Sequence, residues 1–277
     1  MAIIMDGKRL LQKYKNDITE HVEMMYIKPR LSVVLVGNNP ASEIYVKNKQ
    51  KDCQECGINI DIIRLKEDVG QQKLLDVIDQ LNCDYNVDGI LCQLPLPEGY
   101  DYNEQEVCEL IRYKKDVDVF NPYNVGKVSL GNAKLYPCTP HGVISLLDAY
   151  DIDLAGKHCV IISRSNIVGK PMAMLLLERD ATVTVCHSKT KDLKHFTEHA
   201  DVIISAAGKP NLITADIIKE GAVVVDVAIN RDENGKLCGD VDFENVKNKA
   251  GWITPVPGGC GLMTRAMLLK NILITAS

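Results

Sequence analysis

The sequence predicts an α/β fold built on parallel strands. Short runs of β-branched and other apolar residues alternate along the chain with stretches in which apolar residues recur at helical spacing. Several of these runs are apolar almost throughout, which is typical of strands that helices cover on both faces of a parallel sheet. The length of 277 residues allows one large domain or two modest ones.

The first half of the chain is expected to contain three such strands and four helices. Asp6 is a suitable N-cap for the first helix. Pro95 and Pro97 end the third strand, because proline cannot donate to the ladder of a sheet. The predicted strands are residues 31–36, 58–65 and 87–93, and the predicted helices are residues 6–25, 41–56, 71–81 and 103–111.

Residues 114–139 differ from what precedes them, since turn-forming residues replace the periodic apolar positions. We interpret them as a segment between two domains. A helix follows from Pro140, and a second series of strands and helices begins after it. Its predicted strands are residues 158–163, 181–186, 201–205 and 222–227, and its predicted helices are residues 168–178, 191–199, 214–219 and 263–274.

Composition and charge exclude several classes of protein. The formal net charge is −5 and no long basic run occurs, so bulk attraction to nucleic acid or to an anionic membrane is not expected. No apolar run is long enough to span a membrane, and the first residues do not form a signal peptide. We therefore expect a cytoplasmic protein whose ten scattered cysteines are reduced. Cys53 and Cys56 have metal-like spacing, but no second close pair exists, which favours a core or surface position over a zinc site.

A dinucleotide site is indicated in the second half. Residues 160–171 run from a strand through a tight turn into a helix, where backbone amides and a helix N-terminus can bind a phosphate. The usual Gly-x-Gly-x-x-Gly pattern is absent, because Ser163 stands at the first glycine position and only Gly169 remains. The prediction therefore depends on the position of this turn at the start of a strand–helix series.

The next strand indicates which dinucleotide binds. NAD enzymes carry an acidic residue at the end of the second strand, where it binds the ribose hydroxyls. Here residues 185–190 contain no acid. Arg164, Ser188 and Lys189 supply cations and a hydroxyl suited to a 2′-phosphate. The pattern favours NADP over NAD, with a solvated strand end as the alternative interpretation.

Candidate catalytic side chains occur in the first half. Ser42, Tyr45 and Lys49 are spaced to share one face of a helix, although a solvated face explains the same spacing. A lysine serves as an acid or base near neutral pH only where burial or a nearby cation lowers its pKa. Gln93 ends an apolar strand, at the edge where ligand groups collect in open α/β sheets.

Two carboxylates follow, at Asp116 and Asp118. They alternate along an extended stretch and therefore point in opposite directions. One of them could face a cleft and the other a neighbouring lysine. Taken singly, each is more typical of a surface carboxylate.

Together these segments resemble the tetrahydrofolate dehydrogenase/cyclohydrolase family, the bifunctional methylenetetrahydrofolate dehydrogenases/methenyltetrahydrofolate cyclohydrolases. The matching segments follow the family's order and cover nearly the whole chain. They are ASEIYVKNKQKDCQECGI (41–58), DGILCQLPLP (88–97), KDVDVFNPYNVGK (115–127), PCTPHGV (137–143), SRSNIVGKP (163–171), ATVTVCHSKT (181–190), ADVIISAAGKP (200–210), GDVDF (239–243) and TPVPGGCGLMT (254–264).

The resemblance implies two α/β domains with a cleft between them. Residues 1–120 would form a folate-binding catalytic domain, completed by a C-terminal helix over residues 262–277, and residues 121–261 would form a Rossmann NADP-binding domain. Enzymes of this family use NADP to oxidise 5,10-methylenetetrahydrofolate to 5,10-methenyltetrahydrofolate. They then hydrolyse that product to 10-formyltetrahydrofolate in one-carbon metabolism. The family is typically homodimeric through its nucleotide domain, where the strand at 181–186 could supply the interface, and no metal is implied.

Residue roles follow from the matching motifs alone. Lys49 would be the catalytic lysine, and Gln93 would hydrogen-bond to it and tune it. The rest of the predicted catalytic set is Tyr45, stacked on the aminobenzoyl ring of the folate, and Asp118, bound to the pterin edge. The segment predicted to border the folate is Pro257, Gly258 and Gly259. The predicted NADP contacts are Ser163, Arg164, Ser165, Ser188 and the backbone near Ile229.

The sequence departs from the family pattern at five positions. Val119, Ser163 and Ala228 replace glycines, which restricts backbone angles or adds a side chain near a ligand. Cys260 and Leu262 replace a valine and a proline. Two alternatives stay open: a monofunctional NADP-dependent dehydrogenase with weak or absent cyclohydrolase activity, and a nucleotide-sensing or scaffold protein that keeps the fold. The presence of every predicted catalytic residue argues against both.

Overall fold

The computed structural model describes all 277 residues, and the chain divides into two compact units. The three-stranded unit contains Lys13–Cys138 and Arg265–Ser277, and the six-stranded unit contains Met1–Gln12 and Thr139–Thr264. The chain passes from one unit to the other within three helices, α1 (Gly7–Met24), α6 (Cys138–Ala149) and α10 (Cys260–Thr275). Residues 121–138 thus group with the three-stranded unit and residues 1–12 with the six-stranded unit, unlike the boundaries that the motifs implied.

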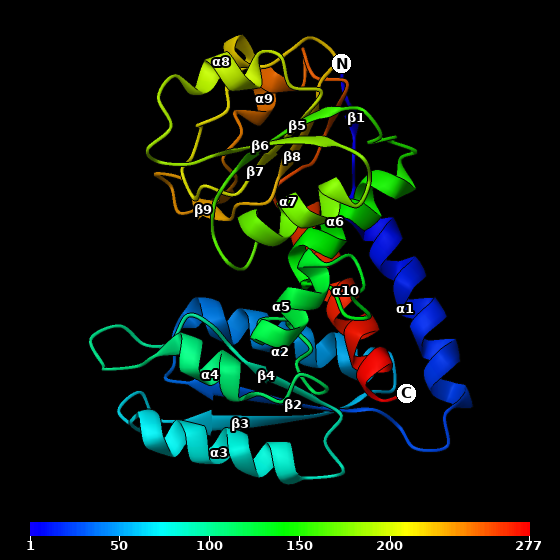
Figure 1. The fold of residues 1–277 in the computed structure, drawn as a ribbon, viewed down its shortest axis with the longest axis vertical. Coiled ribbons are helices and arrows are strands. Elements are labelled where there is room, and N and C mark those ends of the chain that lie inside the picture. The colour runs from blue at the N-terminus through cyan, green and yellow to red at the C-terminus, as the bar shows by residue number, and fades with distance from the viewer. The chain divides into compact units, whose positions relative to one another are not determined.

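The three-stranded unit is a parallel sheet with strand order β3-β2-β4. Its central strand is buried over six of seven residues, as the apolar run predicted. Helices α3 and α4 pack on one face through a single apolar cluster, and α2 lies on the opposite side of the strands from α3 (Figure 1). The elements are β2 (Arg30–Val36), α2 (Pro40–Glu55), β3 (Asn59–Leu65), α3 (Gln71–Cys83), β4 (Gly89–Cys92), α4 (Glu104–Leu110) and α5 (Pro122–Ser129).

Helix α5 lies in the segment that was expected to be irregular. The Asn121 side chain accepts a hydrogen bond from the amide of Tyr123, and Pro122 occupies the first turn. Asparagine at the N-cap followed by proline starts a helix as readily as it forms a turn. The turn interpretation was therefore wrong for residues 122–129.

The six-stranded unit is a parallel sheet with strand order β1-β11-β8-β7-β5-β6. From β5 the chain first adds β6 on one side and then returns to add β7 on the other, so the order reverses between β5 and β7. The elements are β1 (Ile3–Ile4), β5 (His158–Ile162), α7 (Gly169–Leu177), β6 (Thr182–Cys186), α8 (Leu193–Thr197), β7 (Val202–Ser205), the 3₁₀ turn η1 (Ala215–Ile217), β8 (Val223–Asp226), β9 (Asn230–Arg231), β10 (Leu237–Cys238), α9 (Phe243–Val246) and β11 (Trp252–Ile253).

All four long strands predicted for this unit are confirmed. The helix predicted over residues 214–219 is only the 3₁₀ turn η1. Strands β1, β9, β10 and β11 have two residues each, too few to show an alternating pattern in the sequence.

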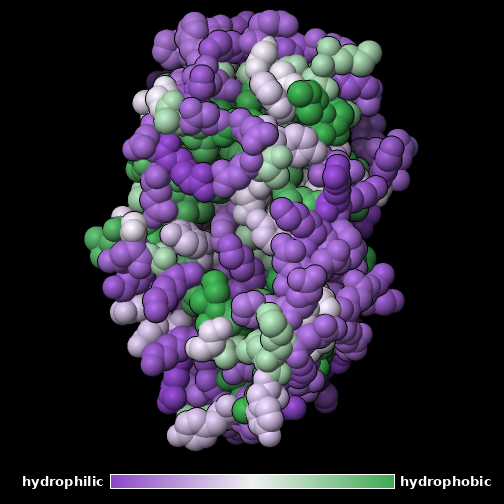
Figure 2. Space-filling view, turned by 90° about the vertical axis from the view of Figure 1, so that its right-hand side faces the viewer, coloured by the Kyte–Doolittle hydropathy of each residue, from purple (hydrophilic) through white to green (hydrophobic).

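One face of the molecule shows how its hydrophobic residues are distributed. On the face drawn in Figure 2, hydrophobic residues form small separate patches among hydrophilic ones. None of the helices combines the length and apolar character that crossing a membrane requires. Cys53 and Cys56 are both buried, in accord with a core position.

Candidate functional site

Lys49 and Gln93 meet at the carboxyl edge of the three-stranded sheet. Lys49 Nζ donates a hydrogen bond to Gln93 Oε1 at 3.0 Å. Gln93 follows the last residue of β4, and its Nε2 donates to the carbonyl of Leu94 at 2.7 Å. Because that second bond fixes the amide, the oxygen of Gln93 is the atom that faces Lys49.

Helix α2 places Tyr45 and Lys49 one turn apart on the same face. It starts after the three-residue turn that follows β2, where the Asn39 side chain accepts hydrogen bonds from the amides of Ala41 and Ser42. Ser42 is buried and Lys49 is hydrogen-bonded, so this face is not purely solvated. Tyr45 is 39% exposed, which leaves its ring accessible, and burial of its hydroxyl raises the pKa of Tyr45.

Asp118 is partly buried close to Lys49. Burial raises the pKa of Asp118, while the positive charge of Lys49 opposes that rise. Neither Asp118 nor Asp116 is the surface carboxylate that the residues taken singly suggested. Sequence spacing did not link Lys49 with Asp118, whereas the fold brings the two within electrostatic reach of each other.

Asp116 is buried among backbone amides and the side chain of Asn124. It is 2% exposed and accepts hydrogen bonds from the amides of Val119 and Asn121 and from Asn124 Nδ2, each at 2.9 Å, and from the amide of Phe120 at 3.2 Å. Burial raises the pKa of Asp116 to about 6, against these hydrogen bonds. Asp116 therefore shapes the turn in which Asp118 lies.

Val119 adopts a left-handed backbone conformation, with φ of 66°. That region favours glycine and costs a β-branched residue about 1–2 kcal/mol. The amide of Val119 is held by Asp116, and its side chain is fully buried, so the surrounding contacts maintain the strained conformation. A glycine at this position would adopt the same conformation without strain.

Two further residues contact the same turn and were not singled out from the sequence. Asn271 Nδ2 donates to the carbonyls of Val117 at 2.8 Å and Tyr136 at 2.9 Å. The Cys138 thiol donates to the carbonyl of Val117 at 3.4 Å. A single amide within the apolar run of residues 263–274 was the signal that could have identified Asn271.

The predicted NADP contacts lie at one edge of the six-stranded sheet. The strands end in register, since Ile162 of β5 pairs with Cys186 of β6 and with Ser205 of β7, which in turn pairs with Asp226 of β8. The turns that follow these strands therefore meet at the carboxyl edge. They carry Ser163, Arg164, Ser165, Ser188 and Ile229, the set predicted from the motifs.

The turn after β5 leads into α7 and is held by its own hydrogen bonds. Ser165 Oγ accepts hydrogen bonds from the amides of Val168 at 3.1 Å and Gly169 at 3.2 Å, at the start of α7. A Cβ atom on Gly169 would lie 2.3 Å from the carbonyl oxygen of Ser163, so this position requires glycine. The Ser163 side chain is buried against Ser165, and it therefore does not fill the turn. Arg164 in this turn is exposed, and its role toward a dinucleotide phosphate stays a prediction.

Residues 257–259 belong to the six-stranded unit and form a tightly held loop. The carbonyl of Gly258 accepts a hydrogen bond from the amide of Gly7 at 2.8 Å, and Gly258 has a φ of 123°. The amide of Leu262, which the usual proline would lack, donates to the carbonyl of Gly259 at 3.1 Å in the first turn of α10. The roles of Pro257, Gly258 and Gly259 toward folate remain predictions.

Comparison with known proteins identifies the family. The tetrahydrofolate dehydrogenase/cyclohydrolase catalytic domain matches residues 5–118, and the NAD(P)-binding domain of the same family matches residues 137–277. The chain belongs to the tetrahydrofolate dehydrogenase/cyclohydrolase family. The resemblance drawn from the motifs and the α/β fold with a catalytic and a nucleotide-binding part are thereby confirmed.

Relatives in the family match over essentially full length. The bifunctional protein FolD of Moorella thermoacetica is 54% identical over 273 residues, which cover 98% of this chain and 97% of that protein. The crystal structure of a bifunctional FolD methylenetetrahydrofolate dehydrogenase/cyclohydrolase from Campylobacter jejuni is 52% identical, with a TM-score of 0.97 over 100% of this chain and 99% of that one. A Trypanosoma brucei family member, solved with NADP cofactor and an inhibitor, is 36% identical with a TM-score of 0.94 over 99% of this chain and 97% of that one.

Proposed function

We propose that Lys49, Gln93, Tyr45 and Asp118 carry out folate chemistry in this chain. The enzyme oxidises 5,10-methylenetetrahydrofolate to 5,10-methenyltetrahydrofolate with NADP and hydrolyses the product to 10-formyltetrahydrofolate. The observation that carries the assignment of residues is the 3.0 Å hydrogen bond from Lys49 Nζ to Gln93 Oε1 in a chain of this family.

In this proposal Lys49 moves the proton that hydrolysis requires. Water adds to the electron-poor carbon of the methenyl cation and releases one proton to solvent. As one C–N bond then breaks, the remaining hydroxyl proton passes from the added oxygen to the departing nitrogen. Lys49 Nζ can relay this proton, because α2 fixes its backbone and Gln93 orients its amine. Gln93 acts through Lys49 and is therefore a positioning residue.

Asp118 and Tyr45 are suited to hold the folate. A carboxylate accepts two parallel N–H bonds, which matches the edge of a pterin. Asp118 is partly buried, and burial strengthens such hydrogen bonds by excluding water. The accessible ring of Tyr45 offers a surface on which an aromatic ring can stack.

NADP supplies the acceptor for the hydride that leaves the methylene carbon. The turn of Ser163, Arg164 and Ser165 is suited to the phosphates, and Ser188 after β6 is suited to the 2′-phosphate. Hydride transfer depends mainly on positioning, so these contacts contribute by fixing the nicotinamide ring.

The chain is proposed to be a cytoplasmic homodimer. Strand β6 is an edge strand of the six-stranded sheet, and Val185 on it is 41% exposed, which supports a second copy pairing there. Light scattering of the purified protein tests the dimer, and a Val185→Lys variant should shift it toward the monomer. The free thiols of all ten cysteines accord with a reducing compartment.

A two-wavelength assay tests the proposed function. Purified protein is given methylenetetrahydrofolate and NADP, and the formation of NADPH is followed together with the rise and decay of the methenyl product. Both activities are expected. NADPH formation with a methenyl product that decays no faster than without enzyme would instead identify a monofunctional dehydrogenase, and absence of NADPH would reject the proposal.

A further inference from the structure

Two buried aspartates, Asp226 and Asp240, lie among the turns of the nucleotide edge and have no part in the mechanism above. Asp226 is the last residue of β8, and Asp240 follows β10. Asp226 is 3% exposed and Asp240 is fully buried. Buried carboxylates are rare unless they are paired or fully hydrogen-bonded, so their partners indicate what they do.

Asp240 ties two turns of the nucleotide edge together. Its Oδ2 accepts hydrogen bonds from Ser205 Oγ and from the amide of Ala207, both at 2.7 Å. Its Oδ1 accepts from the amide of Lys209 at 2.7 Å and from Asn230 Nδ2 at 3.0 Å. The first three donors belong to the end of β7 and the turn after it, and the fourth belongs to the segment after β8.

Asp226 holds the segment that carries Asp240. Asp226 Oδ2 accepts a hydrogen bond from the amide of Val241 at 2.8 Å, and its Oδ1 accepts from the amide of Ala228 at 3.2 Å. The backbone of Gly239 packs directly on this carboxylate, since a Cβ atom there would lie 1.9 Å from Oδ2. The two aspartates thus form one polar network of backbone amides and short side chains.

The position of these turns assigns them to one half of the dinucleotide. A dinucleotide crosses the edge of such a sheet where the strand order reverses, here between β5 and β7. The ribose that carries the 2′-phosphate lies on the side of the second strand of the series, which is β6. The turns after β7 and β8, which Asp240 joins, therefore lie on the side of the nicotinamide half.

We propose that Asp240 is a positioning residue for the nicotinamide half of NADP. It fixes the turn after β7 and the segment of Ile229 and Asn230 in one conformation without touching the reacting atoms. Replacing Asp240 by asparagine turns one of its two acceptor oxygens into an N–H donor, so the backbone amide of Ala207 or of Lys209 loses its acceptor, and the turns rearrange to satisfy it. The inference rests on the NADP binding of the proposed function.

The test compares two ligands that share the adenosine half. NADP and 2′,5′-ADP, which lacks the nicotinamide half, are titrated calorimetrically into the wild-type protein and into Asp240→Asn. Cyclohydrolase activity is measured on methenyltetrahydrofolate without NADP. We expect the Kd for NADP to rise about tenfold or more, and the Kd for 2′,5′-ADP and the cyclohydrolase rate to stay within about twofold. Asp216→Asn, a matched change at an exposed residue of the same unit, should leave all three unchanged.

Each other result counts against the inference. An unchanged Kd for NADP, or equal weakening of NADP and 2′,5′-ADP, overturns it. If Asp240→Asn does not fold, Asn230→Ala decides, because it removes one donor and keeps the buried carboxylate. It should weaken NADP severalfold and leave 2′,5′-ADP unaffected, and no change in NADP affinity would overturn the inference. Failure of the wild-type protein to bind NADP would refute the proposed function itself.

Discussion

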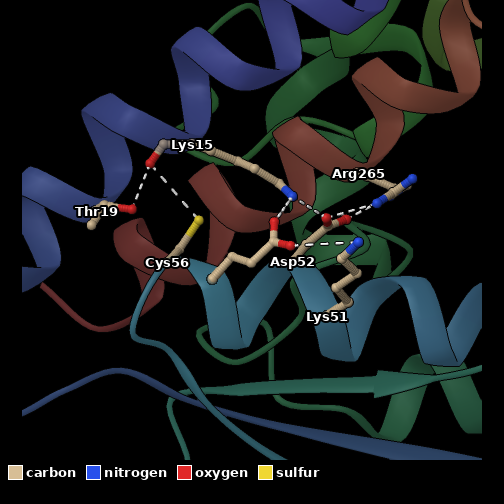
Figure 3. Close-up of polar contacts among 7 residues, drawn as sticks. Lys15, Thr19, Lys51, Asp52, Cys56 and Arg265 are labelled. Carbon is tan, nitrogen blue, oxygen red and sulfur yellow. Dashed lines mark hydrogen bonds and ion pairs between the residues drawn. The ribbon is translucent and has the colours of Figure 1, made fainter.

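Asp52 and Arg265, separated by 213 residues in the sequence, form a two-pronged ion pair in the three-stranded unit. Arg265 Nη2 donates to Asp52 Oδ1 at 2.7 Å, and Arg265 Nε donates to Asp52 Oδ2. Lys15 pairs with the same carboxylate, so Asp52 on α2 joins α1 and α10 (Figure 3). Burial lowers the pKa of Lys15, but hydrogen bonds to Asp52 and Glu55 outweigh it and raise that pKa overall.

Replacing Asp52 by asparagine should destabilise the protein. Two cations would then face a buried site without their shared anion, and loss of one partner of a buried pair costs about 3–5 kcal/mol. We expect the free energy of unfolding in urea to fall by about that amount. Glu55→Gln is the matched control, because Glu55 also pairs with Lys15 but its side chain is 45% exposed, and it should cost less than about 1 kcal/mol. Equal losses in the two variants would refute a special role for Asp52.

Lys49→Met should abolish the cyclohydrolase activity while folate binding largely survives. The change keeps the length of the side chain but removes the amine that donates to Gln93, and loss of general acid–base catalysis typically costs 10²–10⁴-fold, so we expect a fall of at least about 100-fold. The measurement is the decay of methenyltetrahydrofolate, with folate affinity determined by calorimetry. Lys47→Met on the exposed face of α2 should retain full activity. Undiminished hydrolysis in Lys49→Met would exclude Lys49 as the proton carrier.

The sequence predicted the elements whose pattern is local and repeated. Strand β2 was predicted because Val33, Val34 and Leu35 form part of a near-continuous apolar run. Helix α5 was missed because Asn121 and Pro122 are equally typical of a turn and of a helix start. The two-residue strands are defined only by their neighbours in the sheet, and no sequence period encodes them.

For the candidate site, too, local sequence patterns could not predict contacts between residues that are distant in the chain. The spacing of Tyr45 and Lys49 predicted a shared helix face, but it could not show that Gln93, 44 residues away, would accept from Lys49. Asp116 was interpreted as a surface carboxylate. Its role as a buried acceptor depends on the left-handed conformation of Val119, which valine rarely adopts. Asp240 lay within a recognised motif, yet its donors come from segments that only the sheet brings together.

Stability should depend on the ionisation of Asp116. Burial raises the pKa of Asp116 to about 6, above about 3.9 in an unfolded chain. Between these values the folded state binds more protons than the unfolded state, so the contribution of Asp116 to stability falls as the pH rises. We expect the stability of the wild type relative to Asp116→Asn to decrease by about 2 kcal/mol from pH 4 to pH 7.

Urea titrations at both pH values measure this difference. Asp84 provides a contrast, because hydrogen bonds from Asn86 lower the pKa of its exposed carboxyl. The wild type compared with Asp84→Asn should show no fall over the same range. A difference between the wild type and Asp116→Asn that stays constant or grows with pH would contradict the raised pKa.

Gly169→Ala should disrupt the turn after β5, which we propose binds the phosphates of NADP. The added methyl group would lie 2.3 Å from the Ser163 carbonyl oxygen and 2.8 Å from the Arg164 amide nitrogen, so the turn must shift. Calorimetry should then show weaker binding of both NADP and 2′,5′-ADP, together with lower stability. Gly126→Ala in α5 meets nothing within 4 Å and should be neutral or stabilise by up to about 1 kcal/mol. Normal NADP affinity in Gly169→Ala would show that this turn does not bind the phosphates.

The choice of NADP over NAD should depend on Arg164 and Lys189. Both are exposed in turns at the carboxyl edge of adjacent strands, β5 and β6, where the 2′-phosphate is expected. A hydrogen bond to a charged group contributes about 1.5–3 kcal/mol, so Arg164→Ala and Lys189→Ala should each raise the KM for NADP about tenfold or more. The KM for NAD should hardly change, because NAD lacks the phosphate that these cations bind. Lys191→Ala, which removes an exposed cation just beyond this turn, should leave both constants unchanged. If all three variants weakened NADP equally, the effect would reflect the overall charge of the surface and not a defined phosphate site.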